Sequence, residues 1–100
     1  MDYAIGSRKW PGLSKLIEEA GEVTQVAGKL LGTNGAAQHW DGSNLRERLV
    51  EEMGDMLAAV RFVANHNELD YGAILARETA KYELFCQWHA DVLATQVVQK

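Results

Sequence analysis

The stretch at residues 13–31 reads LSKLIEEAGEVTQVAGKLL, and its apolar residues recur at the spacing of one helix face. At about 100° per residue, most of these side chains fall on a single arc. Glu19 projects inside that arc and Glu22 lies at its edge. Because a buried ionised carboxylate needs a partner, these two acids indicate a site within the helix packing.

A second stretch, residues 45–66, repeats the arrangement. It reads LRERLVEEMGDMLAAVRFVANH, in which residues 51–55 are a near copy of residues 18–22. Glu52 falls within the apolar arc of this helix, and Asp55 follows three residues later. The sequence therefore predicts that two acids from each helix face a shared seam.

The four acids predict a bound metal ion. A charge run usually marks a solvated helix face, but duplication inside two apolar arcs favours a site, and no set of four Lys or Arg residues occupies the same arcs. A divalent cation is the expected counter-ion, and ligation by carboxylates alone favours Mg²⁺ or Mn²⁺ over Zn²⁺. Since Mg²⁺ commonly binds substrate phosphates with few protein ligands, phosphate chemistry is expected.

Length and composition limit the classes of protein. One hundred residues predict a single domain over 1–100, and a hydrophobic content of 47% is generous for that length, so a homodimer or homotetramer is expected. The net charge of −4 argues against binding to nucleic-acid polymers or anionic membranes. Cys86 is the single cysteine, and no apolar run reaches the length of a membrane span, which predicts a cytoplasmic protein.

The sequence predicts an all-α fold. A first helix is expected from about Pro11 to Leu31, with Gly32 as its stop, followed by a loop over 32–43. Asn44 begins a capping box with Glu47 and opens a second helix that lasts to about His66.

A third helix is expected after Asp70, which is its predicted cap, because neither Gly nor Pro occurs from Ala73 to the end. A straight helix of that length would measure roughly 40 Å, so we expect it to bend, fray or pack on another subunit. The predicted fold is thus an antiparallel helical hairpin, extended to a small helical bundle and completed by homo-oligomerisation.

These residues resemble a known family. The pattern E-E-x-x-E on one helix, followed by E-x-x-D on the next, is similar to that of the MazG-type all-α nucleoside triphosphate pyrophosphohydrolases. Here it reads Glu18-Glu19-x-x-Glu22 and Glu52-x-x-Asp55, and the resemblance covers about residues 13–82. It implies hydrolysis of a nucleoside triphosphate, often a deoxynucleotide, to a monophosphate and pyrophosphate.

The resemblance also implies roles for individual residues. Glu19, Glu22, Glu52 and Asp55 would be the catalytic Mg²⁺ ligands, while Glu18 and Glu51 would either contact those ligands or be solvated.

Three further residues are candidates for substrate binding. Arg77 stands near the usual basic residue of the third helix, and Lys81 stands where the family commonly has Asn, so either could meet a phosphate. Trp40, in the Gly-rich loop, could stack on a base, although an aromatic residue beside such a turn more often covers the core.

Two other functions remain open at this stage. A phosphoribosyl-ATP pyrophosphohydrolase shares the fold class and much of the acidic pattern. A non-catalytic helical oligomerisation module would carry the same acids as solvated charges. A dinuclear oxygen-activating bundle is disfavoured, because no His follows a Glu by three residues.

Overall fold

Three helices account for most of the residues described by the computed structural model, which are 5–6, 8–34 and 44–98. α1 spans Leu13–Gly32, α2 spans Leu45–His66 and α3 spans Tyr71–Val98. These described residues form no strand, and the predicted all-α class is confirmed. Within the same residues, no helix is long and apolar enough to cross a membrane.

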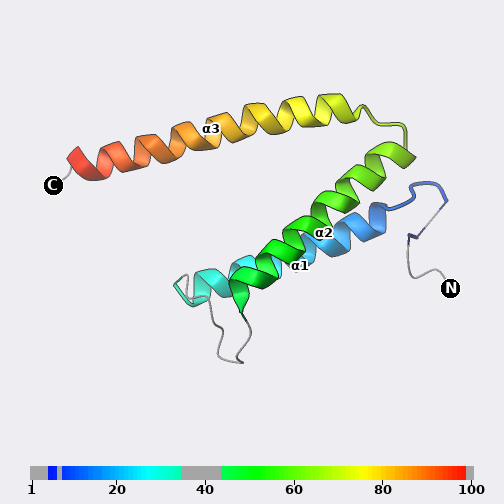
Figure 1. Cartoon of the computed structure of the whole chain (residues 1–100), viewed down its shortest axis with the longest axis horizontal. Helices are drawn as coiled ribbons and strands as arrows, with labels where there is room; N and C mark the ends of the chain where they lie inside the picture. The colour runs from blue at the N-terminus through cyan, green and yellow to red at the C-terminus, as the bar shows by residue number, and fades with distance from the viewer. Residues whose placement is uncertain (1–4, 7, 35–43, 99–100) are drawn as a thin grey trace. The chain divides into compact units, whose positions relative to one another are not determined.

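α1 and α2 lie side by side as an antiparallel hairpin (Figure 1). The start of α1 meets the end of α2, where the Asn67 side-chain amide donates to the Pro11 carbonyl at 3.0 Å. At the other end of the hairpin, Leu30 and Leu49 line the same pocket. Among the described residues, the core is small and consists of five buried apolar residues, Val26, Leu45, Ala59, Val63 and Ala64.

The starts of α2 and α3 are fixed by the predicted side-chain caps. The Asn44 side-chain oxygen accepts the Glu47 backbone N–H at 3.0 Å, and the Asp70 carboxylate accepts the Ala73 N–H at 3.0 Å. Each cap satisfies a backbone donor that the first helical turn leaves without a partner. Both predicted caps are therefore confirmed.

The ends of α1 and α2 use left-handed residues other than glycine. α1 ends at Gly32 as predicted, but the left-handed residue is Asn34, at φ 60°, and its N–H donates to Leu31. After α2, Glu68 has φ 56° and the Leu69 N–H donates to the Ala64 carbonyl at 2.9 Å. This bond back to the last turn is the Schellman arrangement, which turns the chain out of the helix.

α3 belongs to a second compact unit, residues 70–100, whereas the hairpin lies in the unit formed by residues 1–69. The 28-residue helix carries a row of large exposed apolar side chains that includes Tyr82, Phe85 and Trp88. The Lys81 ammonium group lies 5.6 Å from the centre of the Phe85 ring and 5.9 Å from that of Trp88. The single domain and the homo-oligomer both stay predictions.

Gly12 provides a test of the hairpin packing. It is buried at φ 87°, and an added Cβ would lie 2.5 Å from a ring carbon of Phe62. We expect Gly12→Ala to lower the free energy of unfolding by about 2–4 kcal/mol, through left-handed strain and overpacking. Gly28→Ala is the control, because this exposed helical glycine has open space around its Cβ and alanine should add about 0.5–1 kcal/mol. Urea unfolding at one protein concentration measures the free energy of unfolding of both variants. Equal changes in the two variants would contradict the described packing.

Candidate functional site

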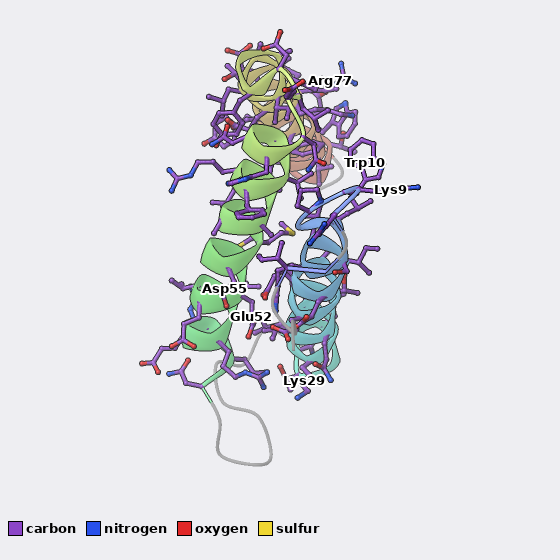
Figure 2. All side chains as sticks on the ribbon, turned by 90° about the vertical axis from the view of Figure 1, so that its right-hand side faces the viewer. Lys9, Trp10, Lys29, Glu52, Asp55 and Arg77 are labelled. Atoms are coloured by element: carbon purple, nitrogen blue, oxygen red, sulfur yellow. The ribbon has the colours of Figure 1, made fainter. Side chains whose placement is uncertain are left out.

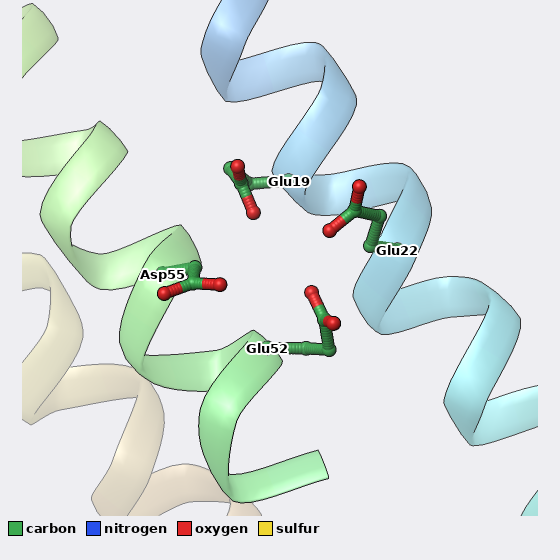
Figure 3. A group of neighbouring side chains, drawn as sticks. All are labelled: Glu19, Glu22, Glu52 and Asp55. Atoms are coloured by element: carbon green, nitrogen blue, oxygen red, sulfur yellow. The ribbon is translucent and has the colours of Figure 1, made fainter. Parts of the chain in front are cut away.

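Four carboxylates meet between α1 and α2. Glu19 and Glu22 come from α1, Glu52 and Asp55 come from α2, and one oxygen from each lies within 4.8 Å of the others (Figure 3). The structure thus brings together the four acids that the sequence singled out as metal ligands.

Helix spacing and hairpin register produce this cluster. In each helix the two acids are three residues apart, which places them on the same face about one turn from each other. Glu52 and Asp55 project from α2 toward α1 (Figure 2). Because the helices run antiparallel, Glu19 lies nearest Asp55 and Glu22 lies nearest Glu52 (Figure 3). The spacing within each helix can be read from the sequence, whereas the register depends on the packing.

Part of the cluster is withdrawn from water. Glu19, Glu22 and Glu52 are half-buried and Asp55 is exposed. The Oε2 atoms of Glu19 and Glu52 are buried and have no hydrogen-bond partner. A buried polar atom without a partner destabilises the fold, and a carboxylate oxygen does so more than a neutral group.

The donor set fits a small divalent cation. Carboxylate oxygens are preferred ligands of Mg²⁺ and Mn²⁺, and two ligands on opposite sides of Mg²⁺ are separated by about 4.2 Å. The oxygens of the cluster lie within 4.8 Å of one another, so small side-chain movements would bring them to that spacing. A cation would also give the two buried oxygens the partner they lack.

The electrostatics of the cluster agree with this fit. A hydrogen bond with Glu22, loss of hydration and three neighbouring carboxylates raise the pKa of Glu52 to about 7. The pKa of Glu19 is also raised, mainly by loss of hydration and then by the charges of Glu22 and Asp55. Both shifts have the same origin, because like charges crowded into a partly dry site favour the neutral acid. Without a cation, the cluster therefore retains protons that exposed carboxylates would release.

Glu18 and Glu51 stand outside the group of four. Glu18 is exposed, and its carboxylate accepts from the Lys15 ammonium group at 3.1 Å. Glu51 is exposed as well. For each of them, the role of contacting the ligands stays a prediction.

Three further residues were predicted to bind the substrate. Trp40 lies outside the described residues. Arg77 and Lys81 lie on α3, in the unit formed by residues 70–100. Their contacts with a substrate stay predictions.

A pocket of about 280 Å³ opens beside the carboxylates. Its charged lining residues are Lys15, Glu19 and Asp55. Its apolar lining residues are Ile5, Ala58, Ala59 and Phe62. Two of the four acids therefore face the pocket, which gives a ligand direct access to the cluster.

The sequence analysis assigned no site role to Phe62. This residue follows Asp55 by seven positions, or about two helical turns, so the spacing does place it on the same face of α2. Its ring stacks on that of His66, with 4.0 Å between centroids and 17° between planes. Lys15 stands four residues before Glu19, so the spacing also places it on the same face of α1 as that acid. The same spacing is equally compatible with a solvated charge.

Comparison with known proteins agrees with the geometry. A family model described as the MazG nucleotide pyrophosphohydrolase domain matches residues 12–87, which include both acidic helices. Searches of curated proteins and of solved structures gave no significant match. Because the family match extends over most of the chain and contains all four clustered acids, this chain belongs to the MazG nucleotide pyrophosphohydrolase domain family.

Proposed function

We propose that this protein hydrolyses a nucleoside triphosphate, with a deoxynucleoside triphosphate expected, to a monophosphate and pyrophosphate. The observation that carries the proposal is the cluster of four carboxylate oxygens within 4.8 Å, two of whose residues also offer a buried oxygen without a partner. Family membership supports the same class of reaction.

In this proposal Glu19, Glu22, Glu52 and Asp55 hold Mg²⁺, or Mn²⁺ in its place. The bound cation would screen the phosphate oxygens and acidify a water molecule. The protein fixes the carboxylates on two packed helices, so that little reorganisation is needed when the substrate binds. The water oxygen attacks the α-phosphorus, and one carboxylate accepts the proton of the water. The bond between the α-phosphorus and the oxygen that bridges the α and β phosphates breaks, and this oxygen leaves with the pyrophosphate.

The pocket beside Glu19 and Asp55 would receive the part of the substrate next to the reacting phosphate. Its volume of about 280 Å³ is at the lower limit of small-molecule sites, so it suits one portion of a nucleotide. The apolar wall formed by Ala58, Ala59 and Phe62 suits a sugar or base. Arg77, Lys81 and Trp40 remain candidates for further substrate contacts.

One experiment distinguishes the proposed activity from the two alternative functions. A panel of ribonucleoside and deoxynucleoside triphosphates, together with phosphoribosyl-ATP, is incubated with Mg²⁺ while pyrophosphate release is measured. Turnover of phosphoribosyl-ATP alone would support the phosphoribosyl-ATP pyrophosphohydrolase. No release from any substrate would contradict the proposed activity and support a non-catalytic helical module.

We also propose that the active protein is a homo-oligomer, a homodimer or homotetramer. The hairpin leaves Ile17, Leu31, Val50 and Leu57 largely exposed, and α3 has its own row of exposed apolar residues. Apolar area of this extent is typical of surfaces that bind another protein. A second copy of the chain would cover it and complete the bundle.

Substitutions separate the four ligands from their neighbours. We expect Glu19→Gln and Glu52→Gln each to lower kcat/KM more than about 100-fold, because replacing even a residue that supports a metal ligand costs 10- to 100-fold. Glu47→Gln is the matched control, since this exposed acid lies on α2 outside the cluster and should leave kcat/KM within about threefold of wild type. Equal losses in all three variants would contradict the assignment.

The pH dependence of stability tests the crowding of the acids. With EDTA present, the folded protein holds a proton on Glu52 between pH 4.5 and about 7, whereas the unfolded chain releases it. The Glu52 contribution to stability therefore falls as the pH rises through this window. Urea unfolding at several pH values should show a steeper fall for wild type than for Glu52→Gln, and parallel curves would contradict this.

Cation binding should show the opposite dependence on pH. Because Mg²⁺ must displace the proton of Glu52, its affinity should increase up to about pH 7, and binding at pH 6 should release protons. Calorimetry in buffers of different ionisation enthalpy measures this release. Affinity that does not change between pH 5.5 and 7.5 would contradict the proposed ligand role of Glu52.

The oligomer can be tested on α3. We expect the wild type to sediment as more than one 11.1 kDa chain, and Trp88→Glu to weaken the assembly by placing a charge in the exposed apolar row. Ala76→Glu adds the same charge about 180° around the helix from Phe85 and serves as the control. A monomeric wild type, or equal effects of both substitutions, would contradict the proposal.

A further inference from the structure

Lys15 is the single cation among the described residues that line the pocket beside the carboxylates. It lies on α1, four residues before Glu19, and is therefore on the same face about 6 Å along the helix axis. Its side chain is 32% exposed, and its ammonium group is 3.1 Å from the Glu18 carboxylate. The residue is thus close to the cluster while its present partner faces solvent.

The charge of the site calls for such a group. A single divalent cation would neutralise only half of the charge of four ionised carboxylates, and the phosphate chain of the substrate is itself strongly anionic. An approaching triphosphate would therefore meet residual like charge. A cation on the pocket wall reduces that repulsion, and an ammonium group can also donate hydrogen bonds to phosphate oxygens.

We propose that Lys15 binds the phosphate chain of the substrate, exchanging its contact with Glu18 for phosphate oxygens. This inference rests on the proposed function and adds a residue to it. The nucleoside would then extend past Lys15 toward the apolar wall of the pocket, where Ala58 and Phe62 lie.

The exchange of partners costs little. Glu18 is 54% exposed, and an ion pair between exposed side chains three residues apart adds little to stability. The released Glu18 carboxylate is hydrated again without any change in the helices.

The experiment uses tripolyphosphate, a phosphate chain without a base, so that it does not depend on the identity of the nucleotide. Its binding in saturating Mg²⁺ is measured by calorimetry for wild type, Lys15→Met and Lys15→Arg. We expect Lys15→Met to weaken binding about 10- to 100-fold, the loss typical of one charge-assisted hydrogen bond, and Lys15→Arg to retain most of the affinity. Mn²⁺ binding without tripolyphosphate should stay within about threefold of wild type in both variants.

Two control variants separate phosphate binding from general effects. Lys29→Met removes the same charge from α1 near the far end of the hairpin (Figure 2), away from the residues that line this pocket, and should leave tripolyphosphate affinity nearly unchanged. Glu18→Gln breaks the ion pair but keeps Lys15, so the affinity should stay equal or increase. With the best substrate of the nucleotide panel, the effect of Lys15→Met should appear mainly in KM.

Each result decides the role of Lys15. Equal affinities for Lys15→Met and Lys29→Met, or equal losses in Lys15→Met and Glu18→Gln, would overturn the proposal, as would failure of wild type to bind tripolyphosphate. A selective loss in Lys15→Met would support it even if wild type released no pyrophosphate from the panel. In that case the proposed activity would fail while the phosphate-binding role of Lys15 would stand.

Discussion

Mutual repulsion of four carboxylates held between two helices is the constraint on which the rest of the site depends. Separated on a helix surface, these acids would be hydrated and fully ionised. Here a hydrogen bond to Glu22, partial loss of water and the charges of its neighbours raise the pKa of Glu52 to about 7. A divalent cation would relieve this repulsion with its positive charge, and it would give the buried oxygens of Glu19 and Glu52 a partner. The same features that destabilise the free hairpin therefore favour cation binding.

The hairpin holds these charges with a modest core. Five buried apolar side chains and the Asn67 hydrogen bond to Pro11 keep α1 and α2 in register, and Gly12 permits the close approach of Phe62. A core of this size gives only a small free energy of unfolding, and each buried oxygen without a partner lowers that free energy appreciably. Cation binding is thus linked to folding. Any group that covers the exposed apolar residues of the hairpin would also stabilise the folded state.

The sequence predicted those features that follow from local spacing. The acids three residues apart, the caps at Asn44 and Asp70, and the all-α class all depend on positions within one helix or turn. The pocket was not predicted, because Phe62 becomes a neighbour of Lys15 only through the packing of α1 against α2. Ile5 joins the pocket from the chain before α1, where its carbonyl accepts the Gly12 N–H at 2.9 Å. Gly32 was predicted as the stop of the first helix and is its last residue, whereas the left-handed residue is Asn34, because asparagine also tolerates this conformation. Local rules thus fix which residues are candidates, and packing decides which of them meet.

The two halves of the cluster differ in their surroundings, and this difference bears on how a substrate would be handled. Glu22 and Glu52 face each other across the seam, whereas Glu19 and Asp55 line the pocket beside Lys15. In the proposed site, Glu22 and Glu52 would hold the cation together with Glu19 and Asp55. Phosphate oxygens would reach the cluster from the pocket, which Glu19, Asp55 and Lys15 line. The asymmetry follows from the antiparallel register, which places one acid of each helix, Glu19 and Asp55, beside the pocket and leaves Glu22 and Glu52 outside its lining.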